Sequence, residues 1–216
     1  MEKVTTVSGI AAPLMRAQID TDIIIRIERL TSLGKDALGA YAFEALRYRP
    51  DGSENPDFVL NQQDYQGAPI LIAGANFGCG SSREGAVWAL MACGIRAVVA
   101  ESFGDIFYNN CFQNGLLPVV LPAEAVERLA EAARMGVPLT VDLQAQEVGP
   151  ARDRSNWGEP IRFEIDPQRR EVLLLGLDDL GQTLRHSADI AAWQERDRAA
   201  RPWIWSPGAA TDERAA

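Results

Sequence analysis

Histidine and cysteine are scarce in this chain of 216 residues, which has one histidine and three cysteines. Cys79, Cys93 and Cys111 are odd in number and far apart, so they suit free thiols better than a disulfide framework. No CxxC motif occurs. Because zinc and iron sites use several Cys and His ligands, we expect this chain to hold no metal. We expect the lone His186 to have a surface or capping role, with a role as base as the alternative.

Long apolar runs and an excess of positive charge are also missing. Residues 1–15 lack the continuous apolar stretch of a signal peptide, and no segment approaches the ~20 apolar residues that span a bilayer. Lysine and arginine total 21 against 30 acidic residues, so the formal net charge is -9. Nucleic acids and anionic membranes bind clustered positive charge, and we expect neither as a partner. A cytoplasmic protein is predicted.

Strand-like and helix-like segments alternate in the middle of the chain. The length and the hydrophobic content of 47% predict one domain, residues 1–207, followed by a flexible tail at 208–216. Three short apolar runs are typical of buried strands, namely Ile70–Ala73, Arg96–Ala100 and Leu117–Leu121. Each is followed by a helical pattern that ends at a glycine. This alternation predicts parallel strands joined by right-handed crossovers.

The last third of the chain has a different pattern. Residues that favour strands are concentrated in three segments, Leu139–Leu143, Ile161–Ile165 and Glu171–Leu175. Asp166–Arg170 has the composition of a hairpin turn. We expect a short terminal helix at Asp189–Arg198 and an anchoring strap at Arg201–Pro207. The sequence therefore predicts an α/β core with an additional antiparallel sheet.

The most informative segment is the glycine-rich stretch at residues 74–84, GANFGCGSSRE. It joins a predicted strand to a predicted helix, where backbone N–H groups at the positive end of the helix favour an anion. Arg83 adds a planar cation suited to a carboxylate or phosphate. Ser81 and Glu84 stand three apart, as in a capping box, so an anion site, a catalytic Ser81 and a plain helix cap are the alternatives. The Walker and GxGxxG patterns are absent, and a nucleotide is not favoured.

A second candidate segment is Asp20-Thr21-Asp22, which precedes three isoleucines. In an extended chain Asp20 and Asp22 project from the same side, although a purely structural turn before a strand has the same pattern. Cys79 lies inside the glycine-rich stretch but has no evident histidine partner, so we interpret it as space-filling.

Together these segments resemble the small subunits of 3-isopropylmalate dehydratase, the swivelling-domain partners in the aconitase superfamily. The resemblance covers about residues 5–205 and depends on six motifs in order: Asp20–Ile24, Asn55–Asn61, Asn76–Glu84, Ser102–Phe107, Asn114–Pro118 and Gly176–Gly181. It implies a swivelling β/β/α three-layer domain, with a mixed sheet whose parallel core strands are joined by helices, plus an antiparallel sheet.

The resemblance also implies an activity. It implies a heteromeric hydro-lyase that isomerises 2-isopropylmalate and 3-isopropylmalate by dehydration and rehydration, in leucine biosynthesis. A [4Fe-4S] cluster is then expected on the large subunit, which is the expected partner, and no cofactor on this chain. The substrate is a small dicarboxylate.

Residue roles follow from the same resemblance. Ser81 is expected to remove the proton next to a carboxylate, while Ser82 and Arg83 bind substrate carboxyl oxygen. Thr21 and Asp22 are expected to border the same cleft. Gly80, directly before the two serines, is also expected to contact substrate.

Two departures from the family pattern bear on the substrate. Gly85 stands where the family usually has histidine, and Ile25–Leu30 replaces the usual proline and the start of the loop that recognises the substituent on malate. Arg26 and Arg29 are expected to add charge near the substrate. The alternatives are a related hydro-lyase for methylmalate or dimethylmalate, or a non-catalytic module that binds a carboxylate.

Overall fold

Two compact units make up the chain, Met1–Asp178 and Asp179–Ala216, and each is described by itself. The computed structural model describes residues 1–151, 157 and 159–205. The first unit is built on a parallel sheet whose strands lie in the order β2 (Ala11–Leu14), β3 (Ile70–Ala73), β4 (Ala97–Ala100) and β5 (Leu117–Val120). β3 and β4 are buried along their whole length, as expected of strands covered on both faces.

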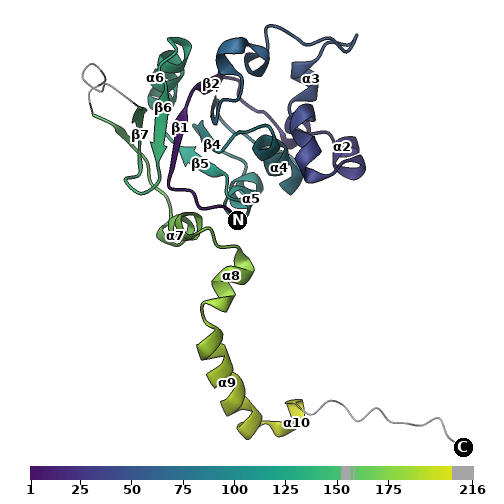
Figure 1. Ribbon diagram of the computed structural model, residues 1–216, viewed down its shortest axis with the longest axis vertical. Coiled ribbons are helices and arrows are strands. Elements are labelled where there is room, and N and C mark those ends of the chain that lie inside the picture. The colour runs from purple at the N-terminus through teal and green to yellow at the C-terminus, as the bar shows by residue number, and fades with distance from the viewer. Residues whose placement is uncertain (152–156, 158, 206–216) are drawn as a thin grey trace, which may run out of the picture. The chain divides into compact units, whose positions relative to one another are not determined.

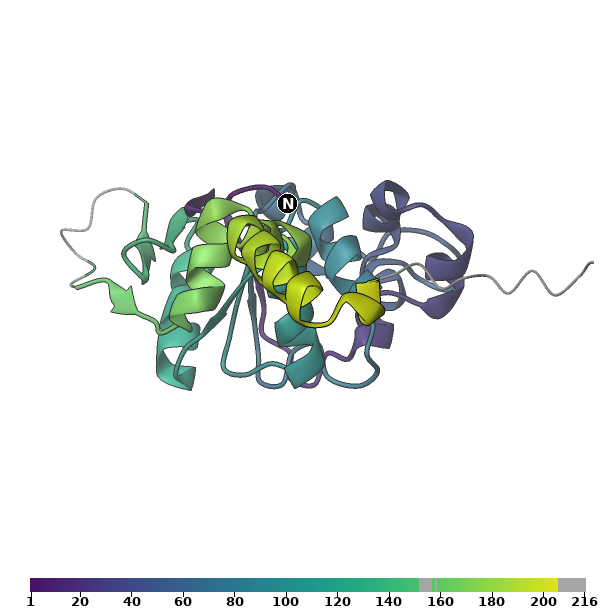
Figure 2. The same ribbon diagram turned by 90° about the horizontal axis from the view of Figure 1, so that it is seen from below.

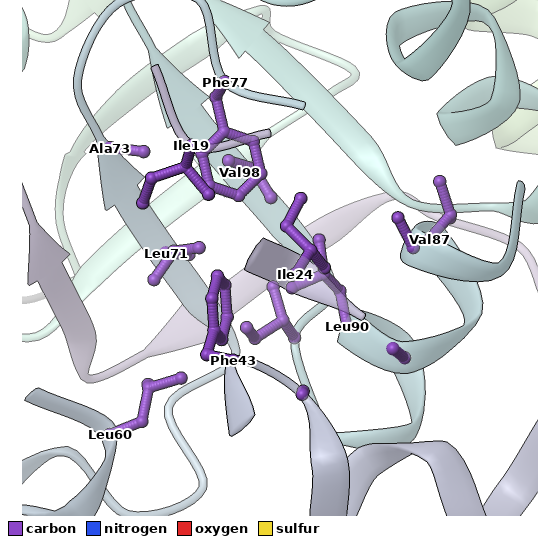
Figure 3. Packing of buried hydrophobic residues seen from close by; sticks show 14 of the residues in the cluster. Ile19, Ile24, Phe43, Leu60, Leu71, Ala73, Phe77, Val87, Leu90 and Val98 are labelled. Atoms are coloured by element: carbon purple, nitrogen blue, oxygen red, sulfur yellow. The ribbon is translucent and has the colours of Figure 1, made fainter. Parts of the chain in front are cut away.

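Successive side chains of these strands enter two separate cores. Leu71 and Val98 belong to a core with α1 (Thr21–Ile24) and α4 (Glu84–Ala92), whereas Ile72 and Val99 belong to a second core with α6 (Ala123–Arg134). This is the alternation that strand geometry requires. Figure 3 shows the first core, in which Ile24 of α1 and Leu90 of α4 lie among the strand residues.

An antiparallel sheet lies on the α6 side of the parallel sheet, as Figures 1 and 2 show. Its strands have the order β1 (Thr6–Gly9), β6 (Leu139–Asp142), β7 (Glu147–Pro150) and β8 (Ile161–Arg162). The predicted α/β class, with parallel strands joined by helices and an additional antiparallel sheet, is therefore confirmed. The parallel and the antiparallel strands belong to separate sheets.

Most of the predicted elements between residues 70 and 143 are confirmed. The helix after β4 is α5 (Asp105–Asn114), and Gly115 ends it with φ 87°, in the left-handed region. Short helices fill the connection between β2 and β3: α1 and then α2 (Ile27–Ser32), η1 (Lys35–Tyr41), α3 (Glu44–Arg47), η2 (Val59–Asn61) and η3 (Gln63–Tyr65).

The predicted hairpin after residue 160 is wrong. Only Ile161–Arg162 forms a strand there, and Glu171–Leu175 lies in the helix α7 (Pro167–Leu175). Asp166 caps this helix, because its carboxylate accepts a hydrogen bond of 3.0 Å from the backbone N–H of Arg169. Pro167 at the first helical position completes a strong start signal, which outweighs the strand preference of the following residues.

The described residues of the second unit form α8 (Asp179–Leu184), α9 (Ser187–Ala200) and α10 (Pro202–Trp205). The predicted terminal helix is thus confirmed as α9. The predicted strap forms α10 in part, and Trp205 Nε1 donates a hydrogen bond of 2.7 Å to Asp197 of α9. Residues 206–207 of that strap and the predicted tail at 208–216 lie outside the described residues. None of the described helices is long and apolar enough to cross a membrane.

Candidate active site

The glycine-rich loop follows β3 and lies at the carboxyl ends of three neighbouring parallel strands, β2, β3 and β4. Gly78 N–H donates to the carbonyl of Ile19, after β2, at 2.7 Å, and Phe77 N–H donates to that of Ser102, after β4, at 3.0 Å. Two isolated parallel bridges, one on each side of the loop, extend this pairing beyond the sheet. In open α/β sheets this edge is where ligands bind.

Thr21 and the loop are joined directly. The backbone N–H of Thr21 donates to the carbonyl of Cys79 at 2.9 Å, and its hydroxyl donates to the carbonyl of Ser81 at 3.0 Å. Thr21 is one of the few buried polar residues of the described chain. Its hydroxyl therefore holds the loop in place, a role that fits its predicted position at the border of the cleft.

Asp22 and Arg83 form an ion pair between the two predicted segments. Arg83 Nη1 donates to Asp22 Oδ1 and, at 3.4 Å, to the carbonyl of Ile25. The Arg83 side chain is 18% exposed and that of Asp22 54%. In the described chain, both hydrogen bonds of this guanidinium involve Nη1, so its Nε and Nη2 edge remains for another carboxylate.

The sequence left open whether Asp20–Asp22 is extended, and the structure shows that only Asp20 has an extended backbone. Residues Thr21–Ile24 form the short helix α1, and Asp20 caps it by accepting a hydrogen bond of 2.7 Å from the N–H of Ile23. The two carboxylates thus have different partners, because Asp20 binds backbone and Asp22 binds Arg83. Only Asp22 of the two belongs to the charged part of the site.

The predicted capping box is also wrong. α4 begins at Glu84, its N-cap residue is Arg83, and no side chain caps it. Ser81 precedes the helix and accepts the N–H of Arg83 with its backbone carbonyl at 2.9 Å. The side chains of Ser81 and Ser82 are exposed. Both residues therefore precede α4 and are open to solvent.

Gly80 lets the loop turn sharply before the two serines. Its φ is +91°, a conformation that side chains rarely adopt, and a Cβ there would lie 3.3 Å from Cβ of Asp20. Asn76 has the same left-handed backbone with φ 57°, and its side-chain amide donates to Gln18 Oε1 at 2.8 Å. Gln18 is not indicated by the sequence, because no local pattern marks a glutamine that supports a distant loop.

Arg26 and Arg29 differ in how they are held. Arg29 makes a bidentate pair with Glu44, at 3.0 and 2.5 Å, and its guanidinium lies 4.1 Å above the ring centre of Tyr41. The hydrogen bonds from Arg29 lower the pKa of Glu44 and raise that of Arg29. Arg26 is exposed, and its Nε lies 3.8 Å from Glu28 Oε2. Arg26 also lines a cavity of about 580 Å³ with Tyr41, Tyr48 and Arg49 among others.

The remaining candidates are Cys79, in the glycine-rich loop itself, and His186, in the second unit. Cys79 lines a cavity of about 340 Å³ between the loop and the start of α5. His186 is at the N-cap position of α9, in the second unit, with its Nδ1 3.7 Å from Asp189 Oδ2. Among the described residues, no three side chains of His, Cys, Asp or Glu are grouped to hold a metal ion.

Comparison with known proteins identifies the family. The model of the aconitase C-terminal domain matches residues 1–124, more than half of the chain. A small subunit of 3-isopropylmalate dehydratase from Rhodospirillum centenum is 52% identical over 205 residues, covering 94% of this chain and 98% of that protein. The chain belongs to the 3-isopropylmalate dehydratase small-subunit family. A member from Xanthobacter autotrophicus is 50% identical and is covered completely.

The family is also evident in the second unit and in the fold. The model of the C-terminal domain of 3-isopropylmalate dehydratase small subunits matches residues 179–204, within the second unit. A crystal structure of 3-isopropylmalate dehydratase from Methanocaldococcus jannaschii superposes with a TM-score of 0.62 at 26% identity, covering 87% of this chain and 98% of that one. The resemblance found in the motifs is thereby confirmed.

Proposed function

We propose that this chain is the small subunit of a 3-isopropylmalate dehydratase, which interconverts 2-isopropylmalate and 3-isopropylmalate in leucine biosynthesis together with a large subunit. The observation that supports this most is the 52% identity to such a small subunit over nearly the whole chain. The arrangement of Ser81, Arg83, Thr21 and Asp22 at the carboxyl end of the parallel sheet agrees with it.

Arg83 binds one carboxylate of the substrate in this proposal. Its Nε and Nη2 edge presents two parallel N–H donors, which match the two oxygens of a carboxylate. Asp22 and the carbonyl of Ile25 hold the opposite side of the guanidinium, so the fork is oriented before substrate arrives. Ser82 and the backbone around Gly80 add donors at the positive end of α4.

Ser81 takes the proton from the carbon next to the carboxylate. The proton moves to Ser81 Oγ, the C–H electron pair forms the double bond, and the C–O bond on the neighbouring carbon breaks so that its hydroxyl leaves with the bonding electrons as hydroxide. In rehydration the hydroxyl adds to the other carbon of the double bond, and Ser81 returns its proton to the carbon that lost the hydroxyl. The positive end of α4 and the Arg83 charge favour the ionised hydroxyl that abstraction requires.

The donors of this chain do not suit a [4Fe-4S] cluster, because the three cysteines are not grouped with other possible ligands in the described chain. We therefore assign the cluster to the large subunit, where it supplies Lewis-acid activation of the leaving hydroxyl. The three free cysteines fit the reducing cytosol, where we place the enzyme.

The decisive experiment is Ser81→Ala in the complex co-expressed with its large subunit. We expect kcat for 3-isopropylmalate to fall about 10²- to 10⁴-fold, the usual contribution of a positioned base. Ser8→Ala changes another exposed serine, in β1, and serves as the matched control.

Two results would contradict the proposal. An intact complex with wild-type kcat in Ser81→Ala leaves only a non-catalytic role for the carboxylate site. Rapid turnover of methylmalate or dimethylmalate, with nearly none of isopropylmalate in the wild type, assigns a different substrate.

A further inference from the structure

Gly85 lies against a side chain of α2, so a Cβ at this position would require that side chain to shift. It is the second residue of α4, is buried, and stands two positions after Arg83. A Cβ built on Gly85 lies 2.3 Å from Cδ2, 2.8 Å from Cδ1 and 3.1 Å from Cγ of Leu30 in α2. Leu30 thus occupies the space that a side chain at position 85 needs.

Leu30 is the residue of α2 that packs against the first core, and η1 is another element of that core that α2 contacts. None of the residues of α2 is fully buried. Leu30 is partly buried and packs against the core that contains α4. Arg29, the preceding residue, is held instead by its ion pair with Glu44 of α3. The contact with Gly85 is therefore where α2 meets the beginning of α4.

Besides the hydrogen bonds of Thr21 to the loop, the segment that includes α1 and α2 contacts the candidate site at two neighbouring points, Arg83 and Gly85. Arg83 binds Asp22 and the carbonyl of Ile25, and two residues further on Gly85 accommodates Leu30. Arg26 lies between these attachments and follows Ile25 directly. The position of Arg26 relative to the Ser81–Arg83 loop is consequently set by the contacts of Arg83 and of Gly85.

We propose that Gly85 and Leu30 are positioning residues for substrate preference: their contact fixes where α2, and with it Arg26, lies beside the Ser81–Arg83 loop. The inference rests on the proposed function. Displacement of α2 changes the surroundings of the substituent on the malate skeleton, whereas the ion pair of Arg83 still orients the carboxylate. The contact therefore affects binding of the substituent in the ground and transition states alike, which alters KM rather than kcat.

Three variants test this contact as a double-mutant cycle: Gly85→Ala, Leu30→Ala and the combination of both. Gly85→Ala adds a methyl group against Leu30, and Leu30→Ala removes the atoms it meets. Gly34→Ala is the matched control, because Gly34 has φ -73° and a Cβ there meets nothing within 4 Å. KM and kcat are measured in the complex for 3-isopropylmalate and for a methyl-substituted malate.

We expect Gly85→Ala to raise KM for isopropylmalate roughly tenfold with kcat changed less than about twofold, a modest loss for a misplaced binding group. The ratio of kcat/KM between the two malates should shift as well. The double variant should recover most of the KM, and Gly34→Ala should behave as wild type. An unchanged KM in folded Gly85→Ala, or losses that simply add in the double variant, would overturn the proposal.

Amide hydrogen exchange of the full-length chain without its partner gives a second measurement. The amides of Arg29, Leu30 and Leu33 bond within α2, so their exchange reports whether α2 is seated. We expect roughly tenfold faster exchange in Gly85→Ala and in Leu30→Ala, and unchanged rates there in either variant would refute the contact. Leu30→Ala adds no volume, so it tests the contact even where Gly85→Ala does not fold. A wild-type complex that is inactive on isopropylmalate refutes the proposed function. An active wild-type complex whose KM does not change with Gly85→Ala refutes only the role of Gly85.

Discussion

Replacing Arg83 by lysine separates the role of its charge from that of its shape. In the structure one nitrogen, Nη1, serves Asp22 and the carbonyl of Ile25, which leaves the Nε and Nη2 edge for substrate. The ammonium of lysine is a single point, so it cannot hold Asp22 and also present two parallel donors. The variant keeps the charge and loses the fork.

The expected loss can be estimated from the donors removed. One charge-assisted hydrogen bond to a substrate carboxylate is worth about 1.5–3 kcal/mol, which corresponds to a rise in KM of roughly 10- to 100-fold. The effect on stability should be small, because Asp22 is 54% exposed and such pairs contribute at most about 1 kcal/mol. Arg83→Lys should therefore impair binding far more than folding.

Steady-state kinetics and thermal unfolding of the same preparation measure both effects. Arg134→Lys is the control, since Arg134 forms an exposed ion pair with Glu127 on α6. A wild-type KM in Arg83→Lys would refute the assignment of Arg83 to the substrate carboxylate. A large drop in melting temperature together with the change in KM would show that the residue is structural.

Two further predictions concern titratable groups. Burial raises the pKa of the Cys111 thiol well above its usual value. Maleimide at neutral pH should therefore label the partly exposed Cys79 long before Cys111, and peptide mass spectrometry can follow the labelling. Preferential labelling of Cys111 would contradict its burial. The hydrogen bond from Arg29 lowers the pKa of Glu44 below its ordinary value of 4.5, so this pair stabilises the fold above about pH 4.5 and loses its effect as the pH falls through the lowered value. Glu44→Gln should flatten that part of the stability profile in acid denaturation, and an unchanged acid limb would exclude the contribution of the pair.

The sequence was sufficient for the parallel sheet because its signals are local. Each buried strand is four apolar residues long or nearly so, and the amphipathic pattern of Ala123–Arg134 coincides with α6. The segment Glu171–Leu175 misled because a run of valine and leucines suits a strand and a helix alike. The helix forms because Asp166 caps it and Pro167 occupies its first turn, and both residues lie before this run.

The candidate site was predictable only in part, for a different reason. The motifs place Ser81, Arg83 and Asp22 in two segments 61 residues apart, and nothing within either segment shows that they meet. The resemblance to the family supplied that expectation. The capping box failed because α4 begins only at Glu84, so that Arg83 and not Ser81 is its N-cap residue.

The net negative charge of the chain is compatible with binding of a small anion at the glycine-rich loop. At physiological ionic strength a charge is screened beyond about 8 Å, so most of the net charge of -9 is not felt by a dicarboxylate at the loop. What such a ligand meets is the 18% exposed Arg83 at contact distance, with the positive end of α4 behind it. A polyanion many times that length must cover the acidic surface as well.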